Sequence, residues 1–203
     1  MKSKLLSISA LLALLASTAT PASAITWLNE TNLSGEADAA FLIFPSSIVV
    51  DPGFTTSLIY AQLYEAGVTD PAGAPVGWSA QIGYGPAGTD PRVDGSWIWL
   101  PAIYDSQQSS SDQFRASFAP AYSGSYSYTY RFSSDSFASA TLADLDGAGS
   151  NAGLTLSTAQ FGAMTVTGNV QPPLPEPTGG VLLIAGLGLV LAGRRRPHSG
   201  QLT

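Results

Sequence analysis

The chain has 203 residues, no cysteine and a formal net charge of −6. Its only histidine is His198, so residues 25–168 have no histidine base, no zinc held by histidine and no Ser-His-Asp or Cys-His arrangement. The same residues hold every acidic side chain except Glu176 and only three arginines, a net charge of about −10 that argues against nucleic acid as a partner. Without disulfides, stability must come from core packing or from cations bound by oxygen ligands.

The N-terminus has the pattern of an export signal. Lys2 and Lys4 precede an apolar stretch at residues 5–16, and residues 21–24 (Pro-Ala-Ser-Ala) supply a helix breaker and two alanines separated by one residue. This pattern is typical of a signal peptide cleaved after Ala24. A buried N-terminal helix is the alternative, but the absence of acidic residues before Glu30 favours a removed leader. We therefore expect residues 1–24 to be a signal peptide and the mature chain to begin at Ile25.

Residues 25–168 are predicted to form one all-β domain. Apolar and polar residues alternate from Tyr126 to Ser133, with aromatic side chains at every second position, as in a strand buried on one face. Similar short runs occur at residues 41–44, 47–50, 56–64, 77–84, 96–100, 113–118, 141–145 and 161–167. Turn residues such as Gly, Pro and Asp separate these runs. Seven or eight strands at this spacing predict an antiparallel β-sandwich, and residues 148–159 are predicted to be a loop or one short helix.

Five segments between residues 58 and 147 carry a resemblance to a known module. They are Ala-Gln-Ile-Gly-Tyr-Gly-Pro at 80–86, Trp-Ile-Trp at 97–99, Asp-Gln-Phe at 112–114, Gly-Ser-Tyr-Ser-Tyr at 124–128 and Ala-Asp-Leu-Asp-Gly at 143–147. Together they resemble an immunoglobulin-like module found in secreted bacterial proteins, some of which act on polysaccharides. The resemblance implies an immunoglobulin-like sandwich and no particular reaction, because a fold does not fix a function.

Three tryptophans, Trp78, Trp97 and Trp99, are candidates for a flat apolar surface on which sugar rings stack. Tyr84 and Tyr104 are candidates for the same surface. Trp97 and Trp99 are two residues apart in a predicted strand, so they point the same way. If that face is outward, the rings form a carbohydrate-binding platform; if it is inward, they belong to the core.

Acidic residues suggest one weak metal site and no catalytic site. Asp144 and Asp146 alternate before Gly147, which resembles the start of a calcium loop, although the distal Glu of an EF-hand is missing. The alternative is a polar turn, and no other cofactor is expected. A glycosidase needs two carboxylates about 5 to 10 Å apart across a cleft. The acidic residues lie mostly in turn-like positions, so we predict no catalytic residue. A polysaccharide-active enzyme is the least favoured of the three hypotheses for the function.

The C-terminal segment has three parts in order. Residues 169–178 contain four prolines and read as an extended linker that includes Pro175, Glu176 and Pro177. Residues 179–193 are apolar and rich in glycine, and Arg194, Arg195 and Arg196 follow, with residues 194–203 as a basic tail. The apolar block of about 16 residues spans only ~24 Å as a helix, less than a ~30 Å hydrocarbon core, and the arginines favour a cytoplasmic end.

This order of Pro-Glu-Pro, short apolar helix and basic cluster resembles the PEP-CTERM sorting signal. The family implies a Gram-negative protein handled by an exosortase-type enzyme, anchored transiently in the inner membrane, relieved of its tail and delivered to the cell surface or a polysaccharide-rich biofilm matrix. A sortase signal is the first alternative, but Leu174 to Gly179 has one residue too many for an LPxTG motif. An uncleaved single-span anchor is the second.

The sequence thus predicts an exported surface or matrix protein that is structural or adhesive and non-catalytic. A carbohydrate-binding module that uses its aromatic face remains the alternative. The expected partners are the processing enzyme, the membrane for a limited time and a polysaccharide.

Overall fold

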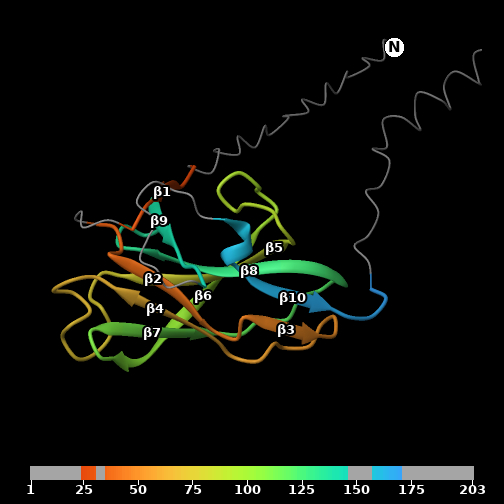
Figure 1. Cartoon of the computed structure of the whole chain (residues 1–203), viewed down its shortest axis with the longest axis horizontal. Helices are drawn as coiled ribbons and strands as arrows, with labels where there is room; N and C mark the ends of the chain where they lie inside the picture. The colour runs from red at the N-terminus through yellow and green to blue at the C-terminus, as the bar shows by residue number, and fades with distance from the viewer. Residues whose placement is uncertain (1–23, 31–34, 146–156, 171–203) are drawn as a thin grey trace, which may run out of the picture.

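The computed structural model describes residues 24–30, 35–145 and 157–170 (Figure 1). This part of the chain is almost entirely β-structure, with ten strands and one short 3-10 helix, η1 (Thr158–Gln160). The strands are β1 (Thr26–Leu28), β2 (Ala39–Phe44), β3 (Ser47–Val50), β4 (Ile59–Tyr64), β5 (Ser79–Pro86), β6 (Ile98–Gln108), β7 (Ser111–Ala116), β8 (Gly124–Ser133), β9 (Ser139–Leu142) and β10 (Gly162–Val166).

The strands form one curled sheet in the order β1-β9-β8-β5-β6-β7-β4-β2, with β10 between β8 and β3. The curl arises at β6, whose first half pairs with β5 and whose second half pairs with β7. The partner changes between Ala102 and Ile103, and a register irregularity follows between Tyr104 and Ser106. One long strand therefore belongs to both layers that face each other in Figure 1.

The last strand of this order, β2, lies beside the segment that follows β9. β2 pairs with β4 on one side, and on the other side the Leu42 amide donates to the Asp144 carbonyl at 2.6 Å. The Asp144 amide returns a hydrogen bond to the carbonyl of Ala40 at 3.2 Å. Backbone groups of an edge strand are costly to leave unpaired, so this short bridge helps to protect β2.

Aromatic side chains of β8 fill the space between the two layers. Tyr130 and Phe132 are fully buried, and the ring of Phe132 packs edge-on against Phe114 of β7 at a centroid distance of 5.4 Å. The Tyr130 hydroxyl donates to the carbonyl of Ile59 on β4 at 2.5 Å. Burial strongly raises the pKa of this phenol, so it remains a neutral donor. These contacts pack the two layers as a sandwich.

The structure corrects two details of the predicted sandwich. The sheet is mixed and not purely antiparallel, because β1 runs parallel to β9 and β3 runs parallel to β10. The prediction that β8 is buried on one face only is wrong, since Thr129 and Arg131 on its other face are also buried. A second apolar cluster covers that face; its members are Trp27, Trp97, Trp99, Leu142 and Phe161.

Most predicted strands occur close to their expected positions. Strand β1 was not predicted, because its three residues show no alternation. The strand predicted at residues 96–100 is shorter than β6, which continues to Gln108. Of the predicted loop or helix at 148–159, η1 is the described portion. The predicted signal peptide, sorting motif, apolar helix and arginine cluster lie outside the described residues. Within the described ranges, no helix has the length and apolar character needed to cross a membrane.

Candidate functional site

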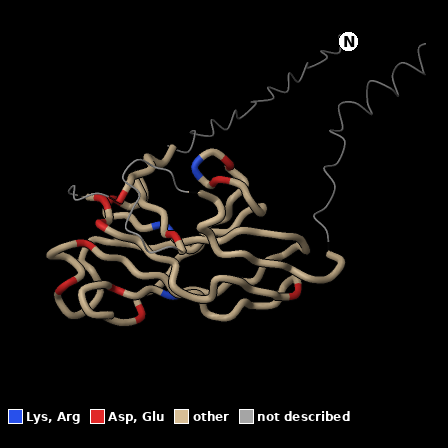
Figure 2. The backbone as a smooth tube through the Cα atoms, in the orientation of Figure 1, with Lys and Arg blue, Asp and Glu red and all other residues tan. Residues whose placement is uncertain are grey.

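A cavity of about 480 Å³ lies beside the second apolar cluster, and we call it the tryptophan cavity. It lies between β1, the start of β6 and the loop of residues 91–95, which stands above the sheet in Figure 2 with its arginine flanked by acidic residues. The side chains that matter for its chemistry are Trp27, Arg92, Asp94, Trp97, Trp99 and Arg131.

Glycines on β5 allow two of the tryptophan rings to lie close to the sheet. A Cβ atom at Gly83 would come within 2.5 Å of the Trp99 ring, and one at Gly85 within 2.5 Å of the Trp97 ring. Glycine inside a strand commonly marks such a close approach. The two rings stack with centroids 5.8 Å apart and an angle of 25° between their planes. Trp27 of β1 adds a third ring, 6.2 Å from Trp99.

Arg131 carries a buried positive charge at the tryptophan cavity. Its side chain is on β8, and the residue is only 7% exposed. The guanidinium carbon lies 4.1 Å from the centroid of Trp99 and 4.9 Å from that of Phe137, which are cation–π contacts. Nε and Nη2 both donate to the side-chain oxygen of Gln81. Burial lowers the pKa of Arg131 to about 10, so the group is still charged at neutral pH.

The loop at the rim of the cavity is held by its own carboxylates. Asp90 accepts hydrogen bonds from Nε and Nη2 of Arg92, the latter at 2.7 Å. This side-chain bonding to Arg92 holds the pKa of Asp90 below its usual value. Asp94 accepts from the Ser96 amide at 2.9 Å, and hydrogen bonds with Ser96 lower its pKa. Both carboxylates are therefore ionised at neutral pH, and Arg92 is already paired.

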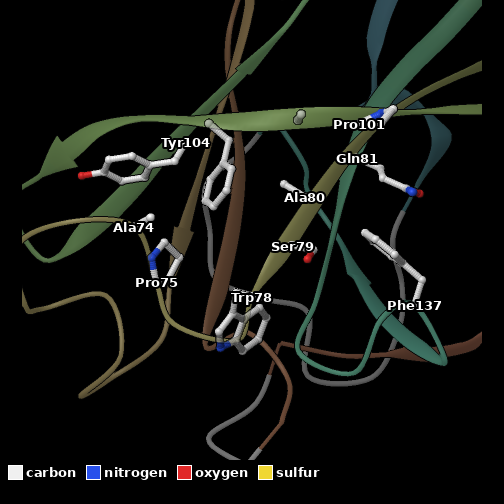
Figure 3. A pocket seen from close by; sticks show the side chains of 11 residues that line it. Ala74, Pro75, Trp78, Ser79, Ala80, Gln81, Pro101, Tyr104 and Phe137 are labelled. Carbon is white, nitrogen blue, oxygen red and sulfur yellow. The ribbon is translucent and has the colours of Figure 1, made fainter.

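Trp78 lies elsewhere, at a second cavity of about 350 Å³ (Figure 3). Figure 3 shows its indole at the opposite end of this cavity from Tyr104, with Phe137 on a third side. The structure thus brings Trp97 and Trp99 together, as predicted from their spacing, and does not bring Trp78 to them. Trp97 is only 6% exposed, so Trp27 and Trp99 provide most of the accessible indole surface at the tryptophan cavity.

The two tyrosines named with the tryptophans have different places. Tyr84 is buried in the main core, where its ring stacks on Phe118 with centroids 4.5 Å apart. Tyr104 is half-buried and lines the second cavity. Neither tyrosine lines the tryptophan cavity.

Asp144 is 1% exposed, and its backbone forms the bridge to β2. Asp146, its predicted partner in a calcium loop, lies outside the described residues. Among the residues that the structure describes, no group of three or more His, Cys, Asp or Glu side chains is arranged to hold a metal ion. Calcium binding at Asp144 and Asp146 stays a prediction.

One other carboxylate has an unusual environment. Asp112 on β7 is fully buried, and neither of its side-chain oxygens has a hydrogen-bond partner in the described part of the chain. Burial raises its pKa to about 6. Asp112 lines neither of the two cavities described above.

Comparison with known proteins gives little guidance. No protein-family model matches the chain, and no curated protein is similar to it. Among solved structures, the chain is similar to the one titled "Crystal structure of the Lin-41 filamin domain", with 12% sequence identity and a TM-score of 0.32. The similarity covers 66% of this chain and 98% of that one. It is a distant likeness between β-rich domains.

Sequence reasoning did not place Trp27 or Arg131 at a site. A signal for the tryptophan cavity was nevertheless available, because Gly83 and Gly85 are two residues apart at the end of the predicted strand 77–84 and just after it, and they leave one face open to large rings. Arg131 was assigned to the solvent face of its strand. Its buried guanidinium contacts the rings of Trp99 and Phe137 and the side chain of Gln81, and Trp99 and Gln81 are distant from it in sequence.

Proposed function

We propose that this chain is an exported protein of the cell surface or extracellular matrix that acts by association and not by catalysis. The proposal is carried by the C-terminal order of Pro175-Glu176-Pro177, a short apolar segment and Arg194 to Arg196, together with the leader pattern at residues 1–24. An exosortase-type enzyme would process the tail, and the membrane would hold the chain only until then. The folded domain suits a structural or adhesive role in a polysaccharide matrix.

The arrangement of carboxylates supports a non-catalytic role. Hydrolysis of a glycosidic bond uses two carboxyl groups that face each other across the substrate. Of the described carboxylates, Asp94 alone lines the tryptophan cavity, and none lines the second cavity. Turnover of a polysaccharide that a single Asp→Asn substitution abolishes would overturn this part of the proposal.

Mass spectrometry of the protein recovered from culture tests the routing. We expect the mature chain to begin at Ile25, to end near Glu176 and to be found outside the inner membrane. An intact tail that includes Arg196, recovered in the membrane fraction, would instead establish a plain anchor. A chain found in the cytosol with both ends unprocessed would refute export altogether.

Carbohydrate binding is the second candidate function. It is favoured by three indole rings and a buried cation around one cavity, since binding sites are lined by aromatic groups with a few placed polar groups. Binding on a glycan array would support this function. Loss of matrix cohesion on deletion, with no binding to any glycan, would support a purely structural role.

A further inference from the structure

We propose that the tryptophan cavity binds a carboxylate-bearing sugar residue of a polysaccharide, with the carboxylate received by Arg131 and the sugar ring packed against Trp27 and Trp99. This inference rests on the proposed function, because only an exported chain meets such a polymer. It goes beyond that function by naming the site, the ligand class and the group that selects the ligand.

The shape of the cavity suits a sugar residue. Its volume of about 480 Å³ lies within the usual range of roughly 300 to 1,000 Å³ for small-ligand sites. Trp27 and Trp99 are half-buried, so each ring has accessible surface, and their planes are tilted by 41° with centroids 6.2 Å apart. Trp97 is buried behind them and stacks on Trp99, which fixes the orientation of that ring. The apolar wall is therefore rigid before a ligand arrives.

The charge of Arg131 indicates that the ligand is an anion. Arg92 pairs with Asp90, and Arg115 pairs with Asp105 at 3.2 Å, but Arg131 has no ion pair within the described residues. A buried cation without a counter-charge is costly, and Gln81 supplies only a neutral acceptor. A ligand carboxylate at this position offsets that cost.

Arg131 also has hydrogen-bonding capacity to spare. A guanidinium has five N–H donors in a fixed fork, and Gln81 accepts from only Nε and Nη2. The described residues offer no hydrogen bond to Nη1. The remaining donors match the planar geometry of a carboxylate, which guanidinium binds in a charge-assisted and often bidentate manner.

Asp94 gives the cavity a second polar group, which suits the other side of a sugar. Its carboxylate is bonded to Ser96 on the rim loop and retains lone pairs that can accept from sugar hydroxyls. A simple inorganic anion bound at Arg131 would gain nothing from Asp94 except repulsion. A sugar acid satisfies both polar groups at once, with its carboxylate toward Arg131 and its hydroxyls toward Asp94.

The test compares two ligands that differ only in the group at C6, which is a carboxylate in one and a neutral hydroxymethyl group in the other. An oligogalacturonate and its carboxyl-reduced counterpart are titrated calorimetrically into the full exported protein, and the tryptophan indole N–H signals are followed by NMR. We expect binding of the acidic oligomer with shifts at Trp27 and Trp99, and binding of the reduced oligomer weaker by about tenfold or more. Equal affinity for the two oligomers would overturn the role of the carboxylate, and no binding of either would overturn the site.

Substitutions locate the binding. Arg131→Gln should weaken binding of the acidic oligomer by about tenfold or more and leave the reduced oligomer unchanged. Trp27→Ala should weaken binding of both oligomers, and it keeps the test valid if Arg131→Gln fails to fold. Trp78→Ala is the matched control, because this half-buried indole lies at the other cavity. Loss of binding in Trp78→Ala with none in Trp27→Ala would overturn the assignment.

The two proposals can fail separately. A chain that is processed at both ends and recovered from the matrix, yet binds no acidic oligomer, refutes the site and leaves the proposed function standing. A chain that binds the acidic oligomer through Trp27 and Arg131 but stays unprocessed in the cytosol refutes the routing and leaves the chemistry of the cavity intact.

Discussion

Asp112→Asn tests how the fold tolerates a buried carboxylate. Asp112 lies in register with Leu63 on β4 and with Gln107 on β6, fully buried, and its two oxygens and Gln107 Oε1 have no hydrogen-bond partner among the described residues. Burial penalises the charged form and raises the pKa from 3.8 to about 6. An asparagine has nearly the same shape, carries no charge and adds N–H donors that can reach acceptors such as Gln107 Oε1.

The pKa shift gives a sign and a magnitude for this effect. Because the folded-state pKa is raised, the folded state binds the proton more tightly than the unfolded state. The stability linked to Asp112 is therefore present below pH 4, falls as the pH rises from about 4 to about 6, and stays low above that range. A shift of about two units corresponds to at most about 3 kcal/mol at pH 7.5.

The assay is urea denaturation of the wild type and of Asp112→Asn at pH 4.0 and pH 7.5. We expect the variant to be more stable than the wild type by about 1 to 3 kcal/mol at pH 7.5 and nearly equal to it at pH 4.0. The control is Asp70→Asn, an exposed side chain whose hydrogen bond from the Gly67 amide an asparagine oxygen can also accept, with a change below about 0.5 kcal/mol at both pH values. A variant less stable at pH 7.5 would refute the reasoning and show that the carboxylate has a compensating partner, such as a bound cation.

Two further predictions concern the tryptophan cavity. Gly83→Ala should lower the free energy of unfolding by about 1 to 3 kcal/mol and change the tryptophan fluorescence, because the new methyl group meets the Trp99 ring at 2.5 Å. Gly95→Ala, where a Cβ meets nothing within 4 Å, is the control, and equal stability of the two variants would contradict the packing argument. Since Ala24 and Ile25 line the cavity, a chain that retains residues 1–24 should bind acidic oligosaccharide several-fold more weakly than one that begins at Ile25, because it lacks the α-ammonium there. Calorimetry of the two forms checks this, and equal affinity would exclude a role for the new N-terminus.

The sequence alone determined the class of the domain and most of its strands. The alternation from Tyr126 to Ser133 identified β8 and its inward aromatic face, because side chains of a strand alternate between its two sides. Gly, Pro and Asp marked the turns, since they supply backbone angles that other residues adopt less easily. The proposed routing signals at the two ends are also inferred from local order and composition, without any tertiary contact.

Only the tertiary structure decided which faces are covered and which side chains meet. A period of two identifies two faces of β8 but does not reveal that β1, β9 and the 91–95 loop bury the second face with Arg131 on it. In the same way, spacing placed Trp97 beside Trp99, but only the folded chain brought Trp27 to them and left Trp78 at another cavity. Burial and ligand geometry depend on contacts between segments far apart in sequence, which no local pattern encodes.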